Sequence, residues 1–344
     1  MITVIIPIYN AETTIERALN SARLADRIIC VDDGSIDNSA KIIHNWNKKH
    51  RNVTYIYQEN SGAARARNKG IAHCETEFVM FLDSDDTLSI NAIPHFKSLV
   101  HQYNKDVYIG RIEHVINGKK VAIKSHTYCE GETTLNDMPS ILQSIGPGAK
   151  LYRTSELTTF DEDITFCEEH TFNVHMFNKQ VYVTDHVVYY YHDTEGSITK
   201  SYENADQYIN DAVIVRNRVY TMLKHTDTAV QLYYSYRMDE LIISYLIKHT
   251  LRHKHNSMFI LEVIKYIENM IQSPYREESL NKIVLFVDIY GNKSERKTLH
   301  EFLNNINISL NDYILDKRVK GQLFKFKTRL KDTIKAIKNN LTSS

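Results

Sequence analysis

Three carboxylates, Asp83, Asp85 and Asp86, fall within four positions directly after the apolar run 78–82. Charges of the same sign repel at such short spacing, so the cluster needs a physical reason. One reason is a solvated turn, because Asp and Ser side chains form hydrogen bonds with nearby backbone groups in turns. The other is a site for a hard divalent cation, since Mg²⁺ and Mn²⁺ bind one or two carboxylates together with the phosphates of a substrate.

Short apolar runs alternate with helical patterns through the first hundred residues and determine where the acidic cluster lies. We predict strands at 2–9, 27–33, 53–58 and 77–83. We predict helices at 12–23, 38–50, 62–74 and 91–103. Strands that alternate with helices indicate a parallel sheet with helices on both faces. The near-continuous apolar character of the strands is typical of strands that are buried on both faces.

Each predicted strand is followed by polar residues at its carboxyl end. The four polar segments are PIYN (7–10), DDGS (32–35), ENSG (59–62) and DSDD (83–86). Ligands of open α/β sheets bind outside these ends, so we expect the segments to line one crevice. The sequence has neither a G-x-G-x-x-G motif nor a G-x-x-x-x-G-K-[ST] loop, which argues against a dinucleotide site. The acidic ends instead suit a nucleotide whose diphosphate arrives with its own metal ion.

The composition narrows the class of protein. The chain has 344 residues, enough for about two domains, and its 42 Lys and Arg balance its 42 Asp and Glu. This balance argues against wholesale nucleic-acid binding. The four cysteines are scattered without a C-x-x-C pair, which favours free thiols in a reducing compartment. The N-terminus is a poor signal peptide and no stretch approaches 18 apolar residues, so we expect a cytoplasmic protein.

Four segments carry a resemblance to a known family: VIIPIYN, VDDGSIDNS, ENSGAARARNKGI and FLDSDD. In this order and at this spacing they resemble the family 2 glycosyltransferases of the GT-A fold. The resemblance is close over residues 2 to about 92. A looser one reaches about residue 201 through GPGAKLYRTSEL, FDEDITFCEEHTFNVHMF and VYYYHDTEGSITKS. It implies a Rossmann-like α/β fold with a mostly parallel sheet and helices on both faces.

The resemblance also implies an activity and a division of the chain. Similar proteins transfer a sugar, with inversion, from a nucleotide sugar to an acceptor hydroxyl, with Mn²⁺ or Mg²⁺ as cofactor. For this chain it implies a UDP-sugar donor and a hydroxyl on a bacterial surface glycan, a teichoic acid, a lipid-linked acceptor or a glycoprotein. We assign residues 1–202 to the glycosyltransferase domain, with a nucleotide-sugar half at 1–105 and an acceptor half at 106–202.

The resemblance assigns roles to residues of the nucleotide side. Asp85, the second acid of a D-x-D motif, would bind the metal, and Asp83 would contact the ribose. Tyr9 would pack on the base, and Asp33 would accept the N–H of a uracil-type ring. The remaining residues of this side are Pro7, Asn60, Arg67 and His192. Of these, His192 would lie near the diphosphate.

The acidic pair Glu168 and Glu169 precedes the helical segment HTFNVHMF. Proteins of the family place a Glu-Asp pair here, which supplies the general base that removes the proton of the acceptor hydroxyl. The resemblance therefore implies Glu169 as the base. Glu168 is the alternative, because one additional methylene shifts the carboxylate of Glu169 by about an ångström. The residues alone also fit first-turn acids that stabilise the helix through its dipole.

Several basic side chains lie close to these motifs. Arg65 and Arg67 are two positions apart on a predicted helix and therefore face different ways. We place Arg67 on the ligand side and Arg65 in solvent. Lys150 and Arg153 follow the Gly-Pro-Gly segment 146–148, where they could bind an anionic acceptor or solvate the surface. We favour the solvated surface for both.

The C-terminal region, 203–344, reads as a helical accessory domain. Its helical segments are 208–225, 239–253 and 258–271, with 279–291 of less certain type. The tail 317–339 carries nine Lys or Arg against one acid, Asp332, and has apolar residues at helical spacing. Such a helix can bind an anionic membrane surface peripherally, or it can pack on its own domain with a solvated basic face.

Two other classes of protein compete with the glycosyltransferase. A nucleotidyltransferase on a similar sheet would have a Gly-rich, Lys-containing loop after the first strand, where this chain has YNAETT. A non-catalytic glycan-binding protein on the same fold would not need Asp33, Asp83 and Asp85 together. The sequence leaves the donor sugar, the acceptor and the oligomeric state open, a homo-oligomer included.

Overall fold

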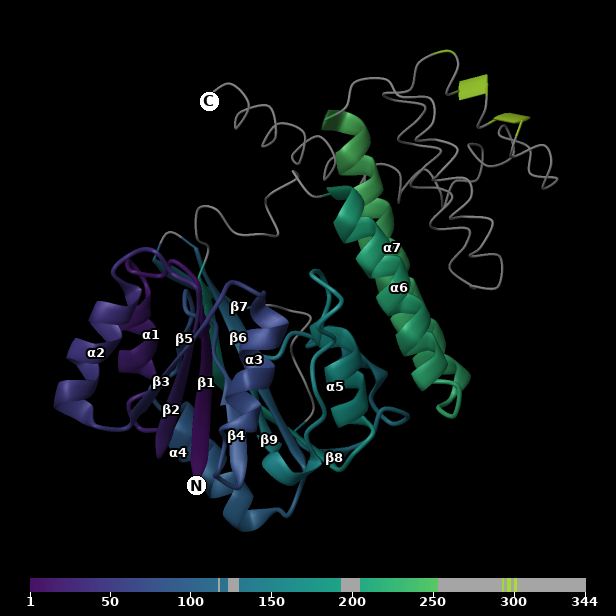
Figure 1. Ribbon diagram of the computed structural model, residues 1–344. Helices are drawn as coiled ribbons and strands as arrows, with labels where there is room; N and C mark the ends of the chain where they lie inside the picture. Colours follow the sequence, from purple (N-terminus) through teal and green to yellow (C-terminus); the bar gives the residue numbers. More distant parts are fainter. Residues whose placement is uncertain are drawn as a thin grey trace. The chain divides into compact units, whose positions relative to one another are not determined.

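The structure, a computed structural model, describes residues 1–116, 118–122, 130–192 and 205–252, with 293, 296, 297, 300 and 301. In this part of the chain, ten strands form one sheet. Eight of them follow the order β3-β2-β1-β4-β9-β6-β10-β5, while β7 pairs with β6 and β8 with β10. Figure 1 shows the sheet with helices on either side of it. The α/β fold that the sequence predicts is therefore confirmed.

The first half of the sheet is parallel and follows the predicted alternation. Its strands are β1 (Ile2–Ile8), β2 (Arg27–Asp33), β3 (Val53–Gln58) and β4 (Phe78–Phe81). Its helices are α1 (Ile15–Ser21), α2 (Ser39–His50), α3 (Ala63–Ala72) and α4 (Ala92–Gln102). Because the four strands run the same way, their carboxyl ends and the polar segments that follow them lie along one edge.

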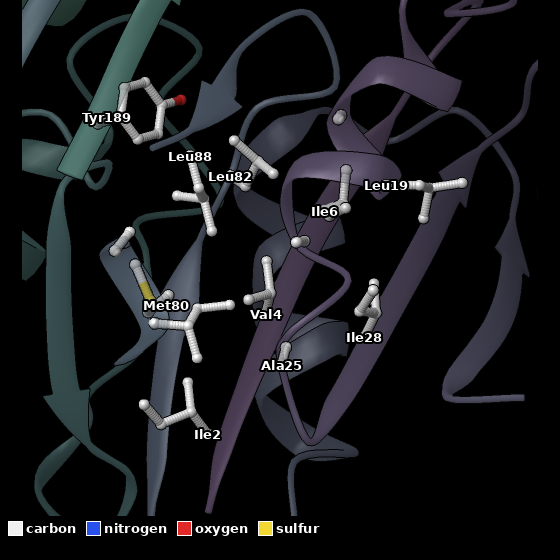
Figure 2. Packing of buried hydrophobic residues seen from close by; sticks show 14 of the residues in the cluster. Ile2, Val4, Ile6, Leu19, Ala25, Ile28, Met80, Leu82, Leu88 and Tyr189 are labelled. Atoms are coloured by element: carbon white, nitrogen blue, oxygen red, sulfur yellow. The ribbon is translucent and has the colours of Figure 1, made fainter. Parts of the chain in front are cut away.

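Alternation along β1 explains why helices cover both faces. Ile2, Val4 and Ile6 point into a core that also contains apolar side chains of α1, α2 and α4, which Figure 2 shows in part. Ile5 points to the opposite face, where it meets α3. A Cβ atom on Gly70 of α3 would lie 2.5 Å from Cγ2 of Ile5, so only glycine allows this close approach. The short distance holds α3 directly on the sheet.

The second half of the sheet is mixed. Its strands are β5 (Thr87–Leu88), β6 (Val107–Ile116), β7 (Lys119–Ala122), β8 (Gly131–Thr133), β9 (Lys150–Arg153) and β10 (Val181–His192). Strand β9 lies antiparallel between β4 and β6, whereas β10 runs parallel to β6. Two 3-10 turns, Pro139–Gln143 and Thr154–Glu156, flank β9. Helix α5 (Glu169–Phe177) follows β9 in the chain.

An aromatic cluster fixes α5 against the sheet. The ring of Phe172 in α5 stacks on Phe160 with 4.1 Å between centroids and lies edge-on to Phe81 of β4 at 5.7 Å. Tyr152 of β9 packs against Phe81 and Phe172 from the side. Such aromatic pairs stabilise packing beyond the area that they bury. The cluster thus places the N-terminus of α5 close to the end of β4.

Two long helices follow the sheet, α6 (Ala205–Met222) and α7 (Thr228–Arg252), where the sequence predicts helices. The chain divides into two compact units, Met1–Ser201 with Asn210–Tyr234, and Tyr202–Ile209 with Ser235–Ser344. The predicted boundary at 202/203 stays a prediction. The predicted segments 258–271 and 279–291 and the basic tail 317–339 lie outside the described residues. Within the described part, no helix combines the length and apolar character that a membrane span requires.

Candidate active site

The turn after β4 separates the three acids of the D-x-D region into different environments. The N–H of Asp86 donates to the carbonyl of Asp83 at 3.0 Å and closes the turn. Asp86 is 1% exposed, and its carboxylate accepts hydrogen bonds from the Tyr189 hydroxyl and the His192 N–H, both at 2.8 Å. Burial, with the charge of Asp83 as a second cause, raises the pKa of Asp86 to about 8. Asp86 therefore ties the end of β10 to the turn.

This tie brings His192 beside the acidic turn. Its Nε2 lies 2.9 Å from Oγ1 of Thr87, and burial together with Arg17 lowers the pKa of its ring. Arg17 also donates a hydrogen bond to the backbone carbonyl of Asp85. His192, at the end of β10, thus presents a neutral imidazole beside the turn, where it can contact a ligand bound over the turn.

Asp33 organises the loop that leads into α3. Its Oδ1 accepts hydrogen bonds from the side-chain amide of Gln58 at 2.8 Å and the N–H of Ser61 at 2.7 Å. Its Oδ2 accepts the N–H of Gly62 at 2.8 Å. Asp33 is nearly buried, so these three donors compensate for the water that its carboxylate has lost. The carboxylate therefore holds strand β2 and the start of α3 in a constant geometry.

The other predicted nucleotide-side residues lie on the same edge of the sheet. Tyr9, directly after β1, is 53% exposed and offers an open ring face, while Pro7 is half-buried. Asn60 is exposed and approaches Gly34, where a Cβ atom would lie 2.9 Å from the Asn60 nitrogen. Gly34 has φ +80, a conformation that side chains rarely adopt, so glycine permits both the turn and the contact.

Arg67 joins the two halves of the site. It lies on α3 and is 6% exposed. One terminal nitrogen donates to Oδ1 of Asp83 at 3.0 Å and the other to Oε1 of Glu168 at 2.8 Å. Its guanidinium carbon lies 5.4 Å from the centre of the Phe160 ring. One rigid guanidinium thus sets the spacing between the D-x-D turn and the acidic pair, which are far apart in the sequence.

The acidic pair stands at the N-terminus of α5. Glu168 is the residue before the helix and Glu169 its first residue, and both side chains are mostly buried. Burial raises the pKa of Glu168 to about 7; the charge of Glu169 adds to this, and Arg67 opposes it. Burial also raises the pKa of Glu169. A carboxyl with a raised pKa is a stronger proton acceptor near neutral pH, as a general base requires.

The backbone before this pair has an unusual conformation. Cys167 has φ +67 and is almost fully buried. Non-glycine residues in this region are uncommon and persist where the surrounding structure demands them. The left-handed residue turns the chain sharply, so that Glu168 faces Arg67 while Glu169 begins the helix. Glu169 Oε1 also lies 3.9 Å from Nε2 of His170, the next residue of the helix.

Lys150 is not on the surface, so the interpretation as a solvated lysine is wrong. Its side chain is fully buried, and its ammonium donates to Oγ of Ser144 at 3.0 Å and to the carbonyls of Gly148 at 2.9 Å and Gly146. The Gly-Pro-Gly segment folds back over the ammonium and supplies the acceptors that make this burial tolerable. Arg153 is half-buried and pairs with Glu77 and Asp106.

The structure therefore adds residues that the sequence reasoning did not assign. Asp86 was visible as one of three acids, but its anchoring role depends on Tyr189, which no motif marks. A Cβ atom on Gly148 would lie 2.8 Å from the Tyr189 ring, so the glycine of the loop is what admits this tyrosine. Asn173, four positions after Glu169 and thus on the same side of α5, is fully buried beneath the pair.

The described residues contain no group of three or more His, Cys, Asp or Glu side chains arranged to hold a metal ion. The D-x-D turn offers a smaller donor set of one or two carboxylates, those of the half-buried Asp83 and Asp85. This small donor set is what Mg²⁺ takes from proteins when substrate phosphates and water complete its shell. The residues present therefore fit a metal that binds together with a nucleotide.

Comparison with known proteins places this geometry in a family. The model of glycosyl transferase family 2 matches residues 3–167. The poly(ribitol-phosphate) beta-glucosyltransferase of Bacillus spizizenii is 31% identical over 204 residues, 55% of this chain and 32% of that protein. The poly(ribitol-phosphate) beta-N-acetylglucosaminyltransferase TarS of Staphylococcus aureus is 31% identical over 174 residues, 48% of this chain and 30% of TarS. The chain thus spans about a third of the length of these two relatives.

Two further comparisons extend over most of the chain. The protein TagX of Staphylococcus aureus is 23% identical over 351 residues, 95% of this chain and 98% of TagX. The crystal structure of Staphylococcus aureus TarS 1–349 in complex with UDP-GlcNAc superimposes with a TM-score of 0.61 at 21% identity. The superposition covers 90% of this chain and 93% of that one, which shows a shared fold. Residues 3–167, which include Asp33, Arg67 and the D-x-D turn, therefore form a glycosyl transferase family 2 domain.

Proposed function

We propose that this protein transfers a sugar, with inversion, from a UDP-sugar to a hydroxyl of a bacterial surface polymer of the teichoic acid class. The observation that carries the proposal is the double contact of Arg67. It holds Asp83, on the predicted donor side, and Glu168, beside the predicted base, at fixed distances of 3.0 and 2.8 Å. A displacement reaction needs this arrangement, because the donor and the base must face each other across the reacting carbon.

The proposed chemistry is one displacement step. The acceptor hydroxyl gives its proton to the Glu169 carboxylate while its oxygen forms a bond to the anomeric carbon of the sugar. The bond from that carbon to the diphosphate oxygen breaks, and the nucleoside diphosphate leaves with the electron pair. Attack from the face opposite the leaving group inverts the configuration. The raised pKa of Glu169 suits proton removal, and Glu168 is the alternative base.

Donor recognition follows from the strand ends. The carboxylate of Asp33 accepts hydrogen bonds and cannot donate them, so it suits a base edge with an N–H, as uracil has. Tyr9 would pack on that base, with Pro7 and Asn60 beside it, and His192 would lie near the diphosphate. Asp83 would contact the ribose. The complex of the related TarS with UDP-GlcNAc supports a uridine nucleotide.

Asp85 is the residue that we propose to hold Mn²⁺ or Mg²⁺. When bound by this carboxylate, a divalent ion would supply positive charge to stabilise the departing diphosphate. The protein contributes the position of this carboxylate. Its backbone carbonyl is held by Arg17, and the turn is closed by the hydrogen bond from Asp86 to Asp83. The acceptor class rests on two relatives, both of which are poly(ribitol-phosphate) glycosyltransferases.

The test is a panel of sugar nucleotides with Mn²⁺ and two acceptors, poly(ribitol phosphate) and poly(glycerol phosphate). We expect UDP-glucose or UDP-GlcNAc to label one acceptor, and NMR of the product to show a β-linkage from the α-linked donor. Glu169→Gln serves as the matched background, because it retains the shape of the site without the base. If no UDP-sugar is bound or transferred, or if the α-configuration is retained, the proposal is wrong.

A further inference from the structure

Lys150, the first residue of β9, is a fully buried cation that the proposed reaction does not use. Removing a charge from water is strongly unfavourable unless hydrogen bonds and an opposite charge compensate for it. An apolar side chain of similar size would fill the interior without this unfavourable free energy. The groups around Lys150 therefore indicate what its charge is for.

The ammonium of Lys150 organises a loop. Its three N–H donors match the three acceptors within reach, Oγ of Ser144 and the carbonyls of Gly146 and Gly148. The ring of Phe177, at the end of α5, lies 5.9 Å from the ammonium nitrogen. Ala149, next to Lys150, has φ +60, so the backbone turns back at this point. Segment 144–149 is thus wrapped around one charged atom.

The same loop is tied to the acidic pair by Asn173. Its side-chain amide donates to the carbonyl of Ile145 in the loop and to the carbonyl of Glu169 at 3.1 Å. Its oxygen accepts the hydroxyl of Tyr152 at 2.6 Å. All polar atoms of this amide are therefore used to join β9, the loop and the first turn of α5. Any movement of the loop around Lys150 is passed to Glu169 through this side chain.

Charge connects Lys150 to Glu169 as well. The charged groups that act on Glu169 are Arg67 and Asp83 from the donor side and Glu168 from its own turn, and His170 lies 3.9 Å away. On Lys150, Glu169 is the charged group that acts: burial lowers the pKa of the ammonium to about 7, and the charge of Glu169 opposes this. Because the attraction of two opposite charges is mutual, the ammonium of Lys150 in turn favours the ionised carboxylate of Glu169.

We propose that Lys150 is a positioning residue for the base: its ammonium holds loop 144–149 and, through Asn173, fixes the first turn of α5 on which Glu169 lies. The positive charge of the ammonium acts in the same direction, because it favours the ionised form of Glu169. This rests on the proposed function, in which Glu169 removes the acceptor proton. Lys150 itself touches neither donor nor acceptor in this role. It acts only on the state and place of another residue.

The test is the pH profile of transfer in Lys150→Met, which keeps the length of the side chain and removes its charge and donors. We expect the acid limb of kcat to move up by about half a unit to one unit, the size of effect that a nearby charge has on a carboxyl. The KM for the donor should not change. Lys179→Met is the matched control, because Lys179 is a partly exposed lysine paired with Glu156. Its profile should equal that of the unmodified protein.

Ser144→Ala is a second variant that tests the same proposal if Lys150→Met does not fold. It removes one acceptor from the ammonium, so the cation is less favoured and the acid limb should move the same way by a smaller amount. The inference is overturned if folded variants lose activity equally at every pH, or if Ser144→Ala keeps the original limb. An active Glu169→Gln, or an absence of transfer by the unmodified protein, would instead overturn the proposed function.

Discussion

Asp33 on the donor side and the acidic pair on the acceptor side have opposite surroundings. On the donor side, Asp33 accepts three hydrogen bonds from Gln58, Ser61 and Gly62. On the acceptor side, Glu168 and Glu169 are buried with few donors, and burial raises the pKa of both. Three hydrogen bonds hold the carboxylate of Asp33 in one position, whereas burial disfavours the charged form of the two glutamates. The difference suits the proposed roles, because a binding carboxylate must stay in place, whereas a base must accept a proton.

The two sides also differ in how they are connected. The strand ends of the donor side come from neighbouring parallel strands, and two of the three donors to Asp33 are backbone N–H groups close by. The acceptor side is joined by long side chains that reach across the fold, Arg67 to Glu168 and Asn173 to Ile145. Long-range side-chain contacts in a buried polar network depend on one another. We therefore expect substitutions on the acceptor side to be strongly non-additive.

The largest expected effect is on the donor side, in Asp85→Ala. Turnover of the UDP-sugar should fall below detection, because the variant lacks the carboxylate that we propose to hold the metal. Circular dichroism should show an intact fold, since this acid is half-buried in a turn. Glu75→Ala, at an acid whose side chain is 80% exposed, is the control. Full activity of Asp85→Ala would show that Asp85 does not hold an essential metal. Full activity in excess EDTA would show that the reaction needs no metal.

The second effect is on the acceptor side, in Glu169→Gln. Transfer should fall about 10²- to 10⁴-fold, the usual contribution of a general base. Binding of the UDP-sugar, measured by calorimetry, should be unchanged, which separates the two sides of the site. Glu168→Gln is the matched variant, and its loss should be smaller. A larger loss in Glu168→Gln would show that Glu168 is the base.

Arg67→Lys tests the connection between the sides. Lysine keeps the charge but cannot donate to Asp83 and Glu168 with a fixed fork, so the spacing of the two sides becomes loose. We expect transfer to fall about 10- to 100-fold. The neighbouring Arg65→Lys, at an exposed pair with Glu162, should be neutral. If steady-state kinetics show equal rates for both variants, the contacts of Arg67 with Asp83 and Glu168 do not contribute to the reaction.

The raised pKa of Glu168 predicts a dependence of stability on pH. The folded protein binds this proton more tightly than the unfolded chain, so stability falls as pH rises from the ordinary pKa of Glu to about 7. Glu168→Gln removes this cost and should raise the free energy of unfolding by about 2–3 kcal/mol at pH 8. Near pH 4 the two proteins should be equally stable. Urea unfolding at both pH values measures this, and an equal difference at both would contradict it.

The smallest effect is expected in Gly148→Ala. The added methyl would lie 2.8 Å from the Tyr189 ring, which must shift and weaken its hydrogen bond to Asp86. We expect a loss of about 1–2 kcal/mol in the free energy of unfolding, typical of overpacking. Gly146→Ala is the control in the same loop, because its new methyl would meet nothing within 4 Å. If thermal unfolding shows the same stability for the two variants, the loop accommodates the added methyl without cost and the prediction is wrong.

Much of the parallel half of the sheet was predictable from short stretches of sequence. The apolar runs that become β1, β2 and β4 are buried on both faces, while the edge strand β3 is partly exposed. All four runs can be recognised from their composition and length without knowing their partners. The polar residues that follow them, with Gly34 and Gly62 at positive φ, mark the turns. Local preference and tertiary structure agree here, because sequential strands and helices pack next to each other.

The acceptor half shows where such reasoning ends. The insertion of β9 between β4 and β6 joins segments that are distant in the chain, and no period in the sequence indicates it. Lys150 was predicted to solvate the surface, as most lysines do, because a lysine is almost never fully buried unless its charge is compensated. Its burial depends on Ser144 and two carbonyls that fold back over it.

By itself, the sequence determined the parallel α/β framework, the polar edge with Asp33, Asp83 and Asp85, and the presence of an acidic pair before a helix. Only the tertiary structure decided that Asp86 is an anchor and that Arg67 spans the two sides. The physical reason is that residue type and spacing specify a pattern along the chain. Burial, ionisation and hydrogen-bond partners depend instead on which remote segments surround a side chain.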